Sequence, residues 1–174
     1  MNIDWRKATG PWNNEADNET WQAHGFTCEI KRTEPMGHLC GYVHIPEEHP
    51  WYAESYDDIG VDVHGGLTFS ARCETSGGWM VGFDCAHFGD VTPMSRVLPF
   101  DHTTSGTYRN WAYVKAETER LAEQAANTLT LVTDEHIAQL KRWVEERKLS
   151  TLELAQCVEL MHEVIRITKK EQAA

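Results

Sequence analysis

The sequence predicts an α+β fold: a mainly antiparallel sheet of about four or five strands, a long helix and a C-terminal helical hairpin. In residues 26–45, 59–69 and 79–85, apolar side chains recur at every second position, which is typical of half-buried strands. From residue 111 onward they recur three or four positions apart, which is typical of one face of a helix. The 174 residues therefore divide into a strand-rich first part and a helical C-terminal third.

The N-terminal part is expected to hold a lead-in, a hairpin and a long loop. Residues 1–24 carry no clean period, so we expect an irregular lead-in whose tryptophans pin it to the body. From Phe26 to Ile45 the alternation is broken by turn-forming residues 34–37, which predicts a β-hairpin. Residues 46–58 mix prolines, acids and aromatics and are expected to form a loop of the length that often carries function.

Alternation returns from Ile59 to Phe69, which predicts a strand interrupted by Gly65 and Gly66. Another strand is expected from Trp79 to Cys85, after a turn signal at 76–78. These segments complete the predicted sheet.

Three helices are expected after the sheet. The first covers about residues 111–125, Thr133 caps the second, and Ser150 with Glu153 forms a capping box ahead of the third. The short joint at 148–149 makes the last two an antiparallel pair. We expect residues 1–127 to form the α+β domain and 128–174 the hairpin. The hairpin has more apolar surface than two helices bury in each other, so it is expected to pack on the domain or on a partner in a homo-oligomer.

Composition excludes several classes of protein. The net charge is −11, from 27 acidic and 16 basic residues, and would repel a phosphate backbone, so no nucleic-acid partner is expected. The sequence lacks an apolar stretch of about 18 residues and a secretory signal, so we expect no membrane partner and a cytoplasmic location. Five cysteines without a CxxC pair indicate free thiols rather than a disulfide framework.

Candidate functional residues concentrate between residues 37 and 101. This segment holds ten acids, only two arginines and five of the nine histidines. Strand alternation would place its polar side chains on one face, opposite the apolar ones. The alternative is that these residues form the ordinary solvated face of an antiparallel sheet. The predicted ligand-binding residues are His38, Tyr42, Asp62, His64, Gly65, Gly66, Asp84, His87 and Asp90.

Metal and cysteine chemistry are the sharper alternatives. No cofactor is expected unless a zinc-like divalent metal is bound, and no HxxxH or HExxH spacing occurs. Cys85 lies in the apolar register and is expected to be a buried structural thiol rather than a nucleophile. The candidate metal ligands are His38, Cys40, His64, Asp84, His87 and Asp90, and the candidate thiol triads are Cys85-His87-Asp90 and Cys40-His64-Asp84.

Four blocks of sequence carry a resemblance to a known family. They are GHLCGYVHIPEEHPWY (37–52), YDDIGVDVHGGLTFS (56–70), GWMVGFDCAHFGD (78–90) and TYRNWAYVKAETERLAEQ (107–124). Together they resemble a family of small, largely uncharacterised bacteriophage and prophage proteins. The resemblance covers roughly residues 20–126 and leaves the C-terminal hairpin outside it. It implies expression in a bacterial cytoplasm during infection, in an accessory rather than a virion role.

These observations predict a phage accessory protein that binds a small polar ligand without turning it over. A nucleotide-derived immune signal of the host, held as a counter-defence, is one such ligand. Arg72, Arg96 and Arg109 are too few cations for a multiply phosphorylated molecule, which favours a ligand of low negative charge. The alternatives are a metal-dependent or Cys/His hydrolase of a small substrate and an acidic inhibitor that binds a host protein.

Overall fold

The protein is represented by a computed structural model that describes residues 4–73, 77–98, 106–130 and 142. The chain divides into two compact units, Met1–Ala126 and Asn127–Ala174, and the sheet belongs to the first. The helical hairpin expected for 128–174 lies outside the described residues, apart from positions 128–130 and 142. Among the helices that the structure describes, none has the length and apolar character needed to cross a bilayer.

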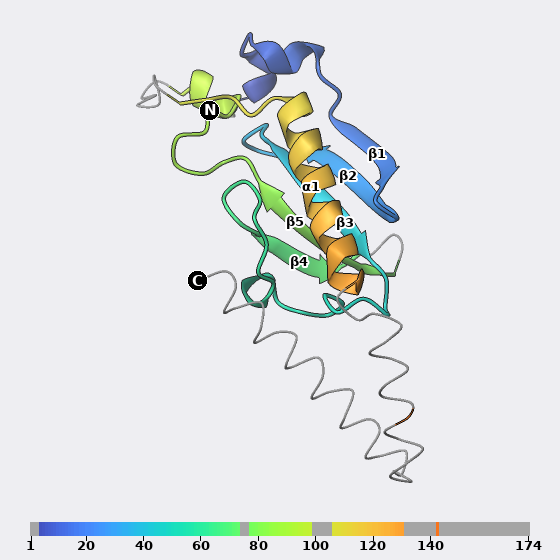
Figure 1. Cartoon of the computed structure of the whole chain (residues 1–174). Helices are drawn as coiled ribbons and strands as arrows, with labels where there is room; N and C mark the ends of the chain where they lie inside the picture. The colour runs from blue at the N-terminus through green and yellow to red at the C-terminus, as the bar shows by residue number, and fades with distance from the viewer. Residues whose placement is uncertain (1–3, 74–76, 99–105, 131–141, 143–174) are drawn as a thin grey trace. The chain divides into compact units, whose positions relative to one another are not determined.

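The first unit is built on a five-stranded sheet in which all neighbours pair antiparallel, in the order β1-β2-β3-β5-β4. One long helix, α1 (Trp111–Thr130), crosses one face of this sheet (Figure 1). The predicted α+β class is therefore confirmed. The strands are β1 (Asn18–Ala23), β2 (Phe26–Arg32), β3 (Leu39–Ile45), β4 (Phe69–Arg72) and β5 (Trp79–Asp84).

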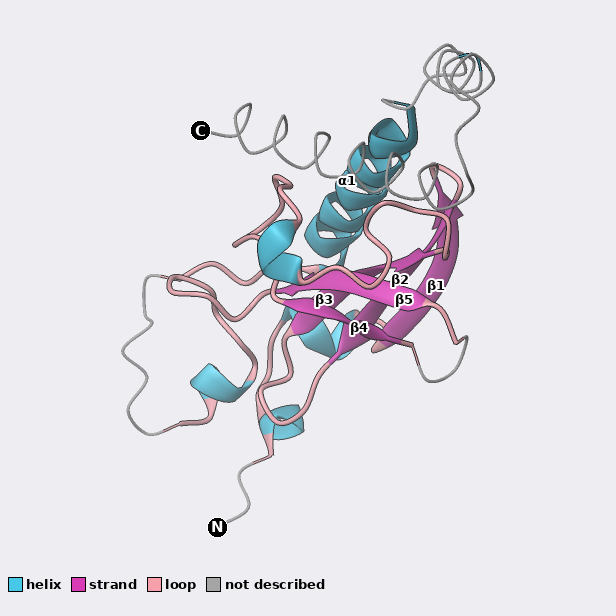
Figure 2. Cartoon of the chain, turned by 90° about the horizontal axis from the view of Figure 1, so that it is seen from below, coloured by secondary structure: helices cyan, strands magenta, loops and turns pink. Residues whose placement is uncertain are grey.

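The core lies between the sheet and α1. The view from below shows that α1 lies on one side of the strands (Figure 2). Strand register brings Val43 opposite Val81, and both are fully buried. Gly41 lies opposite Phe83, and a Cβ atom built on it would stand 2.2 Å from Thr118 Oγ1, so only glycine lets α1 approach β3 this closely.

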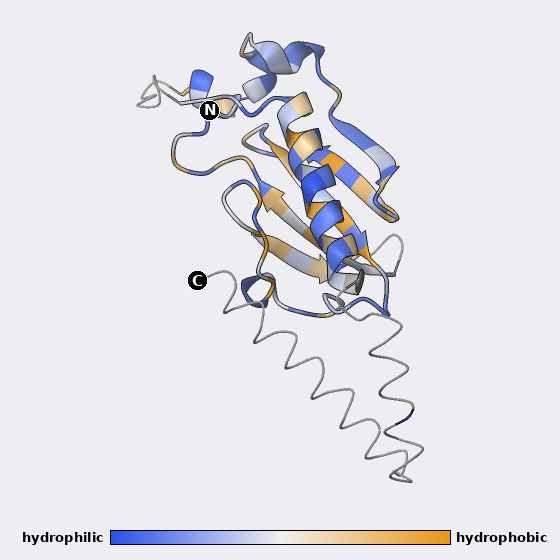
Figure 3. Cartoon of the chain, viewed as in Figure 1, coloured by the Kyte–Doolittle hydropathy of each residue, from blue (hydrophilic) through white to orange (hydrophobic). Residues whose placement is uncertain are grey.

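Helix α1 forms because its apolar positions recur at helical spacing and its first turn is capped. Buried Val114, Leu121 and Ala125 face the sheet. The side chain of Asn110 accepts a hydrogen bond from the backbone N–H of Tyr113 (2.9 Å), as an N-cap residue does. In Figure 3 the strands β2, β3 and β5 carry hydrophobic segments, whereas β1 is hydrophilic along its length.

The N-terminal lead-in contains the edge strand β1, which the periodicity did not predict. Its residues alternate between half-buried and exposed, and none is fully buried, so the sequence carries almost no apolar signal. The tryptophans do anchor the lead-in as expected, because Trp5 and Trp12 are buried beside Met94. The buried guanidinium of Arg32 adds ion pairs to Glu15 (3.0 Å) and Asp17 (2.8 Å).

The strand predicted from Ile59 to Phe69 is wrong, because β4 starts only at Phe69 and residues 59–68 form a loop. Gly65 and Gly66 have φ angles of +67° and +81°, which do not fit a strand. Side chains of α1 bind the loop's backbone instead. The N–H of Asp62 donates to Gln124 (2.8 Å), while buried Ile59 and Val63 produce the apolar alternation.

Candidate functional site

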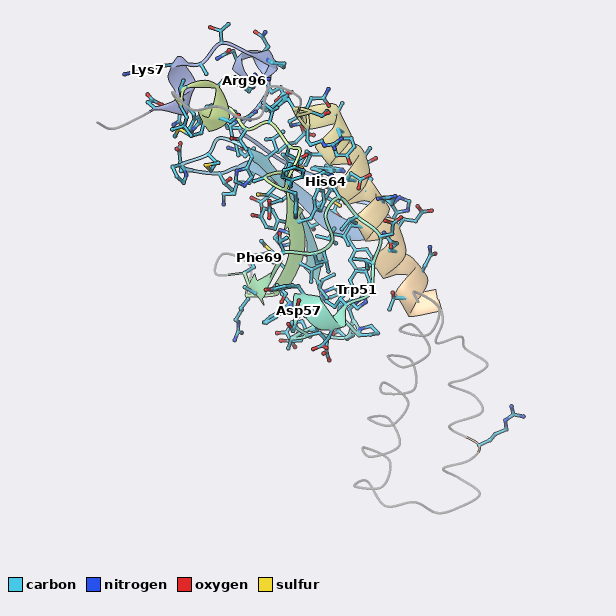
Figure 4. The ribbon with its side chains drawn as sticks, turned by 90° about the vertical axis from the view of Figure 1, so that its left-hand side faces the viewer. Lys7, Trp51, Asp57, His64, Phe69 and Arg96 are labelled. Carbon is cyan, nitrogen blue, oxygen red and sulfur yellow. The ribbon has the colours of Figure 1, made fainter. Side chains whose placement is uncertain are left out.

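Three segments that are far apart in sequence meet at the first turns of α1: loop 59–68, loop 85–90 after β5, and residues 109–113. Figure 4 shows His64 beside the upper half of α1, away from Trp51, Asp57 and Phe69. Hydrogen bonds and ring contacts connect the polar side chains of these segments. We call this group the imidazole–carboxylate cluster; it consists of His64, His87, Asp90, Arg109 and Tyr113.

Asp90 is the centre of the cluster. Its side chain is 1% exposed and accepts three hydrogen bonds: from His64 Nε2 (2.7 Å) and the His87 backbone N–H (3.1 Å) on Oδ2, and from Arg109 Nε (2.8 Å) on Oδ1. Burial by itself raises the pKa of Asp90, but the hydrogen bonds from Arg109 and His64 outweigh burial and hold that pKa below its usual range. Asp90 is therefore a carboxylate at neutral pH.

His64 is held at both ring nitrogens. Because ionised Asp90 only accepts, His64 Nε2 is assigned the hydrogen, and Nδ1 then accepts from the Tyr113 hydroxyl at 3.0 Å. Burial raises the pKa of Tyr113, which keeps that hydroxyl protonated and able to donate. Glu117 also accepts from the backbone N–H of His64 (2.8 Å). The chain Tyr113–His64–Asp90 is thus a positioned row of polar groups.

His87 has one nitrogen without a partner. Its Nδ1 atom is buried and makes no hydrogen bond within the described residues, although it lies 3.8 Å from Asp90 Oδ2 and 3.9 Å from Asp84 Oδ1. The ring packs over Gly65, where a Cβ atom would stand 2.2 Å from it, and makes an edge contact with His64 at 5.3 Å between ring centroids. A buried polar atom without a partner in a native site needs an explanation, and a bound water, ion or ligand is the usual one.

Arg109 supplies the positive charge of the cluster. Its Nε donates to Asp90, its guanidinium lies 4.9 Å from the centre of the Tyr113 ring, and its side chain is 29% exposed. The hydrogen bond to Asp90 raises the pKa of Arg109. Within the described residues its two NH₂ groups make no hydrogen bond. A guanidinium fixed in this way is suited to bind a carboxylate, phosphate or carbonyl oxygen.

The cluster includes three of the predicted site residues, His64, His87 and Asp90. Gly65 and Gly66 lie next to it in the loop, and Asp84 approaches only His87. Asp62 is exposed and pairs with Arg120 (3.2 Å), so it fastens the loop to α1 instead.

The predicted grouping of His38, His64 and Asp84 on adjacent strands is wrong for His64, because residues 59–68 form a loop. His38 does lie near Asp84, since the charges of Asp84, Asp90 and His87 all act on its pKa. His38 precedes β3 and its Nε2 lies 3.0 Å from Thr33 Oγ1. Tyr42 packs edge-on against Phe69 at 5.3 Å, and Cys40 stands opposite Asp84 in the register, both on the face away from α1. His64 lies in a loop beside α1, which strand alternation cannot place.

Tyr113 was not predicted, and Arg109 was named only as one of three cations available to a ligand, because nothing in their local sequence distinguishes them from ordinary helix-start residues. The one available signal is charge, since Arg109 is a cation close in sequence to the acid-rich segment. Knowing the N-cap at Asn110 would place Tyr113 on the first turn, but not against His64.

The two cysteines of the candidate triads, Cys40 and Cys85, do not fit nucleophilic catalysis. Burial raises the pKa of Cys40 to about 11 and raises the pKa of Cys85 still further. Cys85 is 2% exposed, as the apolar register predicts. Because the thiolate is the nucleophile, neither thiol is reactive at neutral pH.

One group of metal-ligating side chains stands out among the described residues. His64, His87 and Asp90 each offer a ligand atom, and these atoms all lie within 4.8 Å of one another. Two imidazoles and a carboxylate are ligand types that suit zinc and similar ions.

Searches against models of protein families, against curated proteins and against solved structures found no match. The interpretation of the site therefore depends on its own chemistry.

Proposed function

We propose that this protein binds a small polar ligand at the imidazole–carboxylate cluster and holds it without turnover. The observation that carries the proposal is the unpartnered, buried Nδ1 of His87 beside a fixed guanidinium. Three separate segments keep these groups in place before any ligand arrives, which lowers the entropic cost of binding.

The groups of the cluster define the chemistry of the ligand. Arg109 and His87 suit a single carboxylate, phosphate or carbonyl group, whereas Asp84, whose side chain is 30% exposed, suits a hydroxyl or amine. Phe88 is fully exposed in the same loop as His87 and offers an apolar ring for a planar group. A nucleoside-like molecule with few phosphates combines these features.

Binding without turnover is favoured because none of the cluster's side chains is an activated nucleophile. Both nitrogens of His64 are engaged, so it has no free site for a substrate proton. Tyr113 keeps its proton because burial raises its pKa, and the thiols of Cys40 and Cys85 are buried.

A biological role follows from the resemblance to phage and prophage proteins. A phage protein in the cytoplasm of its bacterial host would gain from sequestering a nucleotide-derived immune signal. Holding such a molecule intact removes it from the host's receptors as long as the protein is in excess.

The test is a retention assay. The purified full chain is incubated with a panel of nucleotide-derived signals, washed and heat-denatured, and the released molecules are identified by mass spectrometry. We expect an intact compound from the wild type and about 10- to 100-fold weaker binding by Arg109→Gln, as expected for losing a charged hydrogen bond. Arg72→Gln removes an exposed arginine outside the cluster and should bind as the wild type does.

The other outcomes separate the alternatives. A cleaved product would replace the proposal with the hydrolase. If no compound of a broad panel is retained, small-ligand binding is overturned and the acidic protein-binding inhibitor is favoured. Exposed Glu47, Glu48, Asp57 and Asp58 in the loop 46–58 would then be its contact surface.

Self-association through residues 128–174 is a separate proposal that depends on apolar spacing in the sequence alone. Light scattering of the full chain and of a chain truncated after Asn127 tests it. Loss of a dimer on truncation supports it, and a monomer in both samples contradicts it.

A further inference from the structure

We infer that His64, His87 and Asp90 bind one divalent transition metal ion of the zinc type. The ion would be held by His64 Nε2, His87 Nδ1 and Asp90 Oδ2, with a remaining position open to the ligand. The role of the ion rests on the proposed function, because it would hold the anionic or carbonyl group of the molecule that the cluster binds.

The spacing of the three atoms fits such an ion. Zinc bonds of about 2.0–2.2 Å in a tetrahedral arrangement place neighbouring ligand atoms about 3.3–3.5 Å apart. Asp90 Oδ2 lies 2.7 Å from His64 Nε2 and 3.8 Å from His87 Nδ1, so the required separation falls between the two observed ones. Movements of about an ångström or less in the two imidazoles bring these pairs to the bonded geometry.

Each of the three candidate ligands is already oriented from its other side. Arg109 holds Asp90 Oδ1, and the Tyr113 hydroxyl contacts His64 Nδ1 at 3.0 Å. When His64 binds through Nε2, its hydrogen moves to Nδ1 and donates to the Tyr113 oxygen, so the same contact is kept with its direction reversed. The backbone of Gly65 supports the His87 ring. Outer contacts of this kind are typical of metal-binding histidines and carboxylates.

The unpartnered nitrogen of His87 lies beside two other metal-ligating side chains, which favours a metal site over a purely structural network. Asp90 and His64 would be satisfied in either case. Nδ1 of His87 is buried, faces two carboxylates at 3.8 and 3.9 Å and donates to neither within hydrogen-bond distance. A metal ion supplies the missing partner.

The local charge also favours a cation. Asp84 and Asp90 lie near His87, while Arg109 is the basic residue that pairs with Asp90. One negative charge remains uncompensated, in a protein whose net charge is −11. A bound dication reverses this balance and attracts the anionic group of a ligand that the acidic surroundings would otherwise repel.

The experiment is a titration of the full chain, stripped of metal by a chelator, with Zn²⁺ alone in a calorimeter. We expect one ion per chain, and at least tenfold weaker affinity in His87→Ala. Nδ1 of His87 makes no hydrogen bond to the described residues, so this variant should fold normally. His44→Ala is the matched control, because His44 is also half-buried and its buried Nε2 makes no hydrogen bond in the described residues, although it lies 3.5 Å from Glu29 Oε2. His44 is on the sheet face away from α1. The His44→Ala variant should bind zinc as the wild type does.

Equal affinity in His87→Ala and the wild type, or no zinc binding by the wild type, overturns the metal site. The retention assay with and without chelator separates this result from the proposed function. If the protein retains ligand in the presence of chelator and binds no zinc, the metal site is overturned and the ligand site is kept. If the protein binds zinc through His87 but retains no ligand, the proposed function is overturned and the metal site is kept.

Discussion

Gly65 and Gly66 offer a matched pair of substitutions that tests whether the position of His87 matters for binding. Both glycines have positive φ, so alanine at either position strains the backbone, by roughly 1–2 kcal/mol. They differ in what the new methyl group meets. At Gly65 it would stand 2.2 Å from the His87 ring, whereas at Gly66 nothing lies within 4 Å.

The displacement of His87 can be worked out from these distances. Ordinary van der Waals contact starts at 3.4 Å, so the ring must retreat by about 1.2 Å from a methyl group at 2.2 Å. Because Nδ1 of His87 forms no hydrogen bond to the described part of the chain, the ring's retreat should add little to the loss of stability. We therefore expect both variants to lose similar unfolding free energy, and only Gly65→Ala to lose ligand retention and zinc affinity.

Urea unfolding followed by fluorescence measures the stability of both variants, and the retention assay and zinc titration measure the site. Refutation would come from Gly65→Ala binding as well as Gly66→Ala at equal stability. It would also come from Gly66→Ala losing as much binding as Gly65→Ala, since backbone strain would then explain the effect.

Three other predictions concern the described part of the chain. Arg32→Ala breaks a buried ion pair and should lower the unfolding free energy measured in urea by roughly 3–5 kcal/mol. Arg6→Ala breaks an exposed pair and should lower it by less than about 1 kcal/mol. Similar losses in the two variants would contradict the buried network. Burial lowers the pKa of His38 below 6.5, so the unfolded state binds more protons than the folded state below that pH. The unfolding free energy of the wild type should therefore fall relative to that of His38→Gln as the pH drops below 6.5. Parallel pH profiles of the two proteins would contradict this. Among the described cysteines, half-buried Cys73 should be alkylated by iodoacetamide before the buried Cys28, Cys40 and Cys85. Mass spectrometry of peptides from short labelling times shows the order. Early labelling of Cys85 would contradict it.

The sequence was sufficient for the fold class because burial on one face leaves a period in the residues. Phe26, Cys28 and Ile30 in β2 show it clearly, and Val114 and Leu121 show it in α1. β1 was missed because an exposed edge strand has little to bury. Residues 59–68 were predicted as a strand but form a loop. Ile59 and Val63 in this loop have buried side chains, which produces the same apolar alternation as a strand.

The candidate site was predicted in part, for a related reason. Residue type identified His64, His87 and Asp90, since imidazoles and carboxylates concentrate in the middle of the chain. Their meeting with Arg109 and Tyr113 depends on the loop 59–68 lying beside α1, which no local pattern encodes. Strand alternation instead grouped His64, His87 and Asp90 with Tyr42, which alternates along β3 with the core-facing Val43.

An NMR titration shows whether a small ligand binds at the imidazole–carboxylate cluster. The ¹⁵N-labelled full chain is titrated with each compound of the nucleotide panel, with and without zinc, while amide and imidazole resonances are followed. If a compound binds at the cluster, saturable shifts concentrate in residues 62–66, 84–90 and 109–113, while the resonances of Tyr42 and His44 on the opposite sheet face stay unchanged. Shifts centred on that opposite face, or none with any compound, would contradict binding at the cluster.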